Sequence, residues 1–370
     1  MNVLEVLFLM GLILLDRIES ILCLSSPSSY IDSSLIIFPI LQERCGLTDA
    51  PPDEDVVTVA VGGLLEDPEN SYSLVEVETD TQCVLSLPPL PQRLMLDPLV
   101  CLVAETILLC SSDYETYRAK HHRHTQCWRL NLTRRPRVWV SVQSPLRSLF
   151  LPTLTSHGSK IYMLGGSEEL LAGSEMSLMS GTRTVQTYDI VSNTWDLPPA
   201  QLPAPLFEGC AVSTSQGIVI IGDFEAGLPN AYISAYISQQ GEAQWRPLPV
   251  SNYAHTNPGC SVVTMNNITG VLVISGLRAE LLSLEDNKWI KLPQLKIRRF
   301  SELRPTVGTS LGRVVVVGGV DRDTGQVSDV IEVWDEEERD WVVSRQVMDN
   351  RRTRQTELAV PVRYLDSCNL

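Results

Sequence analysis

Short runs of apolar, mostly β-branched residues recur along the chain, and each run ends at small residues. The run GRVVVVGGV, from Gly312 to Val320, contains four consecutive valines, and such a run fits a strand that is buried on both faces. A spacing of about 50 residues between strand-like runs predicts a propeller or a related array of repeats. The other runs end at Gly62-Gly63, Gly165-Gly166, Gly222-Asp223 and Ser275-Gly276, with a weaker one at Ser111-Ser112.

A tryptophan follows most of these runs at a similar distance. Between the run and the tryptophan lie another strand-like segment and a polar turn, as in VQTYDIVSNTW and VIEVWDEEERDW. Asp, Asn and Glu supply the turn chemistry between two strands. With one further strand before each run, the pattern predicts four antiparallel strands and no helix in every unit. The landmark positions are Trp139, Trp195, Trp245, Trp289 and Trp341, with Cys83 at this place in the first unit.

This combination resembles the Kelch repeat, in which a strand ends in a double glycine, an aromatic strand follows, and a tryptophan opens the last strand of a propeller blade. The resemblance covers residues 56–366 and is most specific in the third and sixth units. It implies an all-β fold, a six-bladed β-propeller of Kelch-like four-stranded blades. We expect the units to span 56–95, 96–148, 149–206, 207–256, 257–302 and 303–366.

The two ends of the repeat region complement each other. The first unit begins directly at its glycine run, so its first strand is missing. Residues 357–365 have the pattern of one more strand at the other end. We expect this C-terminal strand to complete blade one and close the ring, because closure removes two exposed sheet edges.

Charge and the N-terminal segment limit the possible partners and compartment. The net charge of −15 excludes nucleic acid and anionic membrane surfaces as expected partners. Residues 6–15 are ten apolar residues, which is too short to span a bilayer and fits the hydrophobic region of a signal peptide. We therefore expect a signal peptide at 1–25, a lead-in at 26–55, no membrane insertion and a secreted or extracellular protein, with a cytoplasmic location as the alternative.

Cysteines and glycosylation motifs agree with an oxidising compartment. The chain has nine cysteines, and removal of a signal peptide that contains Cys23 leaves an even number. If the ring closes, Cys45 and Cys368 come together, and we predict a disulfide between them. Cys210 and Cys260 are interpreted as small buried thiols, and a cross-strand contact between Cys101 and Cys110 is left open. The two acceptor motifs begin at Asn131 and Asn267.

In a propeller, the loops from second to third strands and the loops between blades leave on the same side, here named the loop face. Cations gather there, and bidentate guanidinium groups suit an acidic ligand. The alternative is that these arginines brace neighbouring backbone. Both glycosylation motifs fall on the opposite side, which leaves the loop face accessible. The predicted ligand-binding residues are Arg93, Arg147, Arg298, Arg299, Arg352, His121 and His122.

These features favour a module that binds a protein or peptide, rather than an enzyme. We expect no cofactor and no metal, because His121, His122 and His124 have no carboxylate or thiolate partners at suitable spacing. A long loop in the third unit, residues 167–184, carries apolar Leu170, Leu171, Met176 and Met179 and is interpreted as a contact surface or an unstructured insertion.

Two alternatives come from other six-bladed propellers. One is a sugar-active enzyme of the sialic-acid mutarotase type, which would pair Arg298 or Arg352 with Glu302 or Glu357. The other is a fragment of a cytosolic substrate adaptor for ubiquitin ligases.

Overall fold

In the computed structural model, every residue with a described structure belongs to one compact unit, Thr48–Leu370. The predicted signal peptide and lead-in therefore lie outside the described residues, as do Cys45, Arg93, His121, His122 and Glu302. Within the described residues, no helix is long and apolar enough to cross a membrane. The described ranges are 56–61, 64–65, 74–76, 83–85, 87–88, 99–112, 125–168, 181–222, 234–238, 244–255, 257–299, 305–326, 328–347, 352–353 and 356–368.

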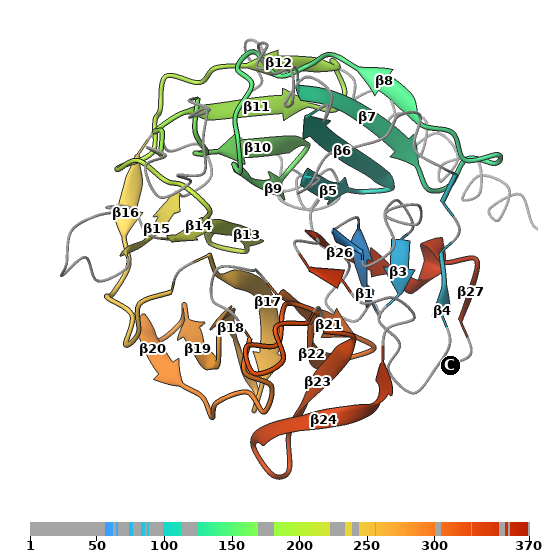
Figure 1. The fold of residues 1–370 in the computed structure, drawn as a ribbon. Coiled ribbons are helices and arrows are strands. Elements are labelled where there is room, and N and C mark those ends of the chain that lie inside the picture. Colours follow the sequence, from blue (N-terminus) through green and yellow to red (C-terminus); the bar gives the residue numbers. More distant parts are fainter. Residues whose placement is uncertain are drawn as a thin grey trace, which may run out of the picture. The chain divides into compact units, whose positions relative to one another are not determined.

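Five antiparallel sheets of four strands form the blades of an all-β propeller (Figure 1). In each sheet the strands follow one another in chain order, as the sequence predicts for units two to six. The strands are β5 (Leu99–Val103), β6 (Thr106–Ser112), β7 (Thr125–Asn131) and β8 (Val140–Val142); β9 (Thr153–His157), β10 (Lys160–Leu164), β11 (Val185–Asp189) and β12 (Thr194–Asp196); β13 (Cys210–Thr214), β14 (Gly217–Gly222), β15 (Ser234–Ser238) and β16 (Trp245–Pro247); β17 (Gly259–Met265), β18 (Ile268–Ser275), β19 (Arg278–Ser283) and β20 (Lys288–Lys291); β21 (Thr306–Ser310), β22 (Arg313–Val317), β23 (Val330–Asp335) and β24 (Asp340–Val347).

The first strands of consecutive blades lie against each other. β9 contacts β5 and β13, and β17 contacts β13 and β21. The second strands are buried on both faces: in β22, Val314 to Val317 are at most 2% exposed. This burial explains the valine run, since the strand lies inside a sheet and between neighbouring blades.

The two ends of the described chain form three smaller sheets. β1 (Val56–Val61) pairs with β26 (Thr356–Pro361) on one side and with β3 (Leu74–Glu76) on the other. Two short pairs are separate: β2 (Leu64–Leu65) with β25 (Arg352–Thr353), and β4 (Cys83–Val84) with β27 (Ser367–Cys368). A one-turn 3-10 helix, Val362–Tyr364, lies between β26 and β27.

The prediction of six four-stranded blades is therefore corrected to five. The first unit is a three-stranded sheet, because β4 has only two residues and pairs with β27 instead of β3. The C-terminal strand does pair with β1, but it ends at Pro361, just before the 3-10 helix begins at Val362.

The double glycines mark a sharp turn under steric crowding. Gly318 and Gly319 have positive φ angles of 68° and 85°, which glycine adopts without strain. A Cβ atom at Gly166 would lie 2.8 Å from the backbone oxygen of Phe150, in the loop that enters the same blade. The glycines therefore serve a structural role, since each allows the strand to turn where neighbouring backbone lies close.

The recurring tryptophans connect consecutive units. In four units the indole Nε1 donates a hydrogen bond to a backbone oxygen just after the last strand of the preceding unit. This repeated bond accounts for the tryptophan period in these four units, since each of the four tryptophans ties its blade to the preceding unit. The bonds are Trp139 to Pro88 (3.0 Å), Trp195 to Gln143 (2.8 Å), Trp289 to Pro249 (2.7 Å) and Trp341 to Pro293 (3.2 Å).

Two disulfides correct the sequence-based interpretation of the cysteines. Cys210 and Cys260 are bonded across β13 and β17, with 6.1 Å between their Cα atoms. The interpretation as separate thiols was wrong because adjacent first strands approach within disulfide range. Cys110 bonds to Cys127 on the neighbouring strand, and Cys101 is a buried thiol.

Candidate functional site

The loop face is assembled as the strand order predicts. Isolated β-bridges join loops between blades to loops that follow second strands: Phe150 to Ser167, Thr182 to Leu206, and Arg299 to Asp321. These bridges show that both classes of loop lie on one side of the blades.

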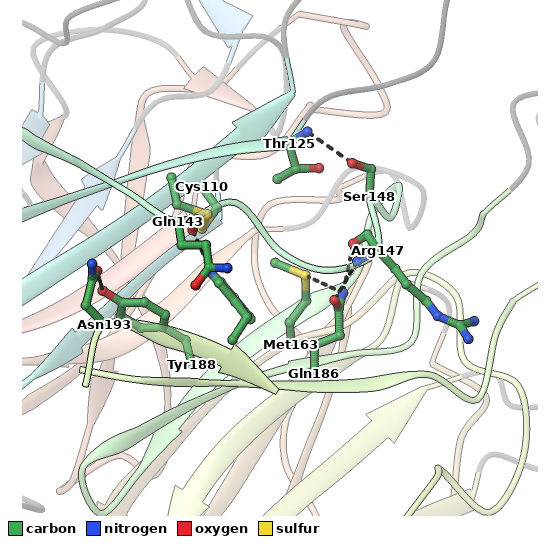
Figure 2. Close-up of a disulfide and its surroundings, with 11 residues drawn as sticks. Cys110, Thr125, Gln143, Arg147, Ser148, Met163, Gln186, Tyr188 and Asn193 are labelled. Carbon is green, nitrogen blue, oxygen red and sulfur yellow. Dashed lines mark hydrogen bonds between the residues drawn. A yellow bond between two sulfur atoms is a disulfide. The ribbon is translucent and has the colours of Figure 1, made fainter. Parts of the chain in front are cut away.

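Arg147 lies on this face with its side chain exposed. Its guanidinium Nη1 is 2.6 Å from Glu168 Oε1, and both side chains are about half exposed. The backbone of Arg147 is fixed by buried Gln186, whose Oε1 accepts the Arg147 N–H at 2.7 Å and whose Nε2 donates to the Arg147 oxygen at 2.8 Å (Figure 2). The loop is therefore anchored while its charge remains accessible.

Arg298 and Arg299 are neighbours in sequence and differ in environment. Arg298 is 50% exposed, and its Nη1 lies 3.6 Å from Asp323. The Arg299 side chain is fully buried. Its Nη1 pairs with Glu332, and its Nε donates to the backbone oxygen of Gly318 at 2.8 Å. These contacts agree with the alternative that Arg299 braces neighbouring backbone, because its buried guanidinium has no N–H group that a partner could reach.

The remaining predicted residues are described only in part. Arg352 is paired through its backbone with Leu65, and its side chain lies outside the described structure. Glu357 lies in β26 opposite Ala60. Asn131 ends β7 and contacts Glu105, which lies in the β5–β6 turn, and exposed Asn267 lies in the β17–β18 turn. Both glycosylation motifs are thus placed on the side opposite the loop face.

Sequence reasoning missed three buried polar residues with a common role. Gln186, Glu280 and Glu332 lie on third strands and bind backbone N–H groups of the loop that enters their own blade. Glu332 Oε1 accepts from the backbone of Lys296 at 2.5 Å and of Ile297 at 3.3 Å. A polar residue inside an otherwise apolar strand, as in VIEVWD, is the signal that identifies this role.

Glu280 is the centre of a denser polar cluster. It accepts hydrogen bonds from the backbone of Asn252 (3.0 Å) and Tyr253 (2.9 Å), and from the Asn252 amide (2.5 Å). Nε2 of buried His255 is 3.0 Å from its carboxylate. Burial raises the pKa of Glu280, but the hydrogen bonds from His255 and Asn252 outweigh burial and hold the pKa below its ordinary value.

The Glu280 cluster fixes the backbone of Tyr253, and two exposed cations lie beside the ring of this tyrosine. The Arg278 guanidinium lies 5.1 Å from the ring centroid of Tyr253, and the Lys291 ammonium lies 5.3 Å from it. Both cations are exposed, and no carboxylate of the described residues pairs with either. Tyr253 lies in the loop before β17, Arg278 is the first residue of β19 next to the β18–β19 turn, and Lys291 is the last residue of β20. All three therefore belong to the loop face, and we name them the Tyr253 cluster.

Within the described residues, no three His, Cys, Asp or Glu side chains are grouped as metal ligands. The chemistry that the site offers is electrostatic. The Tyr253 cluster presents unpaired positive charge, and the exposed pairs of Arg147 and Arg298 can exchange their carboxylate partners.

The strand order and the loop face define a propeller, and comparison with solved structures agrees. One similar structure is titled "Structure of YjhT"; it superimposes with a TM-score of 0.52 at 15% identity, over 68% of this chain and 84% of that chain. At this identity the likeness concerns the fold alone. No protein-family profile and no curated protein matches the chain. The Kelch resemblance therefore stays a prediction.

Proposed function

We propose that this chain is a binding propeller whose loop face captures an acidic segment of a protein or peptide. The observation that carries this proposal is the Tyr253 cluster, where two exposed cations flank an aromatic ring on a fixed loop. Carboxylates can pair with both cations, while apolar parts of a peptide contact the ring.

Exposed ion pairs elsewhere on the loop face extend this surface. An exposed pair contributes about 0 to 1 kcal/mol, so an acidic partner can replace Glu168 beside Arg147 or Asp323 beside Arg298 at small cost. Arg93, Arg352, His121 and His122 remain proposed contributors from the same side.

An enzyme of the mutarotase type is the less favoured reading. Such an enzyme needs an arginine and a carboxylate that both reach the substrate. Arg299 and Glu332 do converge, but both side chains are fully buried. This burial removes Arg299 and Glu332 as candidates for that chemistry.

We also propose that the β26-β1-β3 sheet and the β4-β27 pair make a sixth, Kelch-like blade that closes the ring. Two observations support this. β26 contacts both β5 and β21, the first strands of the first and last four-stranded blades. Trp139 bonds to Pro88 just after β4, the same relation that later tryptophans have to complete blades.

The proposed location is extracellular, after removal of a signal peptide over residues 1–25. Two disulfides fit an oxidising compartment. Glycans at Asn131 and Asn267 would lie opposite the loop face and leave it open to a partner.

The test measures binding of a fluorescein-labelled peptide of alternating Glu and Ser, with a Gln-for-Glu peptide as reference. We expect fluorescence anisotropy to show binding of the acidic peptide that weakens with salt. The double variant Arg278→Glu/Lys291→Glu should weaken it at least tenfold, which is about 1.4 kcal/mol.

The matched control is Arg134→Glu/Lys288→Glu, which makes the same charge change in the β7–β8 turn and at the first residue of β20, opposite the loop face. This control should change the dissociation constant less than threefold. Equal losses in both double variants would indicate a response to net charge. That result, or equal binding of the Gln peptide, would overturn the proposal.

A further inference from the structure

Two cysteines that are far apart in the sequence are opposite each other in a short sheet. β4 and β27 are antiparallel, and their register pairs Ser367 with Val84 and Cys368 with Cys83. The sequence predicts Cys45 as the partner of Cys368. The backbone register instead places Cys368 beside Cys83.

The register alone satisfies the main distance requirement of a disulfide. Opposite residues in an antiparallel pair have Cα atoms about 4.5 or 5.5 Å apart, depending on the hydrogen-bonding type of the pair. Both separations fall within the range of roughly 4.4 to 6.8 Å found for disulfides. The same chain provides a precedent, because Cys110 and Cys127 are direct register partners on β6 and β7 and are bonded.

The C-terminal segment is fixed close to this point by an ionic contact. The Asp366 carboxylate forms ion pairs with two arginines of the loop after β7. Arg135 Nη2 lies 2.7 Å from Asp366 Oδ1, and Arg137 Nη1 lies 2.8 Å from Oδ2. The Arg137 side chain is 5% exposed, and it also donates to the backbone oxygen of Tyr364 at 2.7 Å. These contacts order the backbone two residues before Cys368. Less conformational entropy is therefore lost when a disulfide forms at Cys368.

Apolar packing also holds the segments next to β4 and β27. Leu85 is buried and Leu87 half-buried, and they follow Cys83 closely. They share one hydrophobic cluster with Tyr364 and Leu365, which precede Cys368. Both cysteines are therefore flanked by backbone that is held in place independently of any covalent bond.

We propose that Cys83 and Cys368 form a disulfide that locks the C-terminal segment onto the first unit. Formation uses an external disulfide as oxidant, for example glutathione disulfide. One cysteine thiolate attacks this disulfide and releases one thiol, and the second cysteine displaces the other. The two electrons and two protons of the cysteine thiols thus pass to two molecules of reduced thiol. The bond closes a loop that contains nearly the whole propeller.

The test is peptide mapping of the full chain after incubation with glutathione disulfide and its thiol. Remaining thiols are alkylated in denaturant without reductant, and linked peptides are identified by mass spectrometry. We expect a Cys83–Cys368 peptide in samples where the Cys110–Cys127 peptide is also intact. In such samples, a Cys45–Cys368 peptide or an alkylated Cys368 would overturn the proposal.

Variants separate the two possible pairings by a second measurement. Cys83→Ser, Cys368→Ser and the double variant should share one thermal midpoint, about 5 to 10 °C below that of the parent chain, because each removes the same bond. Cys45→Ser should keep both the Cys83–Cys368 peptide and the parent midpoint. If Cys45→Ser releases Cys368 while Cys83→Ser does not, the pairing predicted from the sequence holds instead.

Discussion

Replacement of Arg299 by methionine tests whether this arginine stabilises neighbouring backbone or binds a ligand. Arg299→Met preserves much of the side-chain volume and removes the charge. It leaves the Glu332 carboxylate fully buried, with backbone N–H groups of Lys296 and Ile297 as its remaining donors.

The expected cost follows from this burial. Removal of one partner of a buried ion pair costs about 3 to 5 kcal/mol, because the remaining charge is neither solvated nor compensated. The adjacent substitution Arg298→Met is the matched control, since that side chain is half exposed and its pair with Asp323 is long. An exposed pair of this kind contributes at most about 1 kcal/mol. The two variants should therefore differ by at least about 2 kcal/mol.

The assay is urea unfolding followed by tryptophan fluorescence. Trp334 lies on the same strand as Glu332, and its ring packs edge-on against Trp341 with centroids 5.3 Å apart. The emission therefore reports on the blade that is perturbed. The double variant Arg299→Met/Glu332→Gln should recover part of the loss, because it removes the uncompensated charge.

One result would refute this reasoning. If Arg299→Met costs no more than Arg298→Met but weakens binding of the acidic peptide, then Arg299 is accessible in solution. The sequence-based assignment of Arg299 to ligand binding would then stand, and the bracing interpretation would be wrong.

Three further predictions address other parts of the molecule. Asp366→Asn should lower the free energy of unfolding by about 2 kcal/mol in thermal or urea unfolding, since buried Arg137 loses a charged partner; an unchanged midpoint would contradict this. Burial raises the pKa of Cys101 to about 12 from 9.0, so its contribution to stability is complete below pH 9 and is lost as the pH rises towards 12. Iodoacetamide at pH 9 should accordingly label Cys101 much more slowly in the folded chain than in urea, and equal rates would contradict the burial. The pKa of Glu280 is lowered because its hydrogen bonds outweigh burial, so its carboxylate stabilises the fold above about pH 4.5 and this gain is lost in acid; the stability difference between the parent and Glu280→Gln should be large at pH 7 and should shrink as the pH falls below about 4.5.

The sequence predicts the blades well because their signals are local. A strand buried on both faces must be continuously apolar, and the turn after it needs positive φ angles, so β22 and Gly318-Gly319 can be recognised without knowing their neighbours. The tryptophans repeat for a similar reason, since four of them make the same bond to the preceding unit.

The parts that could not be predicted depend on distances between distant segments. The Cys210–Cys260 bond requires that β13 and β17 approach closely, and no pattern within either strand encodes this approach. The first unit differs from the others because β4 finds its partner at the C-terminus, where its two residues pair with β27. Both features follow from the packing of whole sheets.

The site was harder to predict because loops have no hydrophobic period. Arg298 and Arg299 are identical residue types one position apart, yet one is exposed and the other is buried against Glu332. What distinguishes them is an acidic residue more than thirty positions later, in the third strand of the same blade. The sequence does contain that acid, but its meaning depends on strand order.

The loop face therefore has two layers with separate tasks. The buried layer consists of Gln186, Glu280 and Glu332, which hold the entering loops by their backbone N–H groups. The exposed layer consists of Arg147, which one of these fixed loops carries, and the Tyr253 cluster, whose tyrosine lies on another. Because the loops are ordered before a partner arrives, binding costs little additional loop entropy. Substitutions in the exposed layer should then change affinity without changing stability, whereas substitutions in the buried layer should change both.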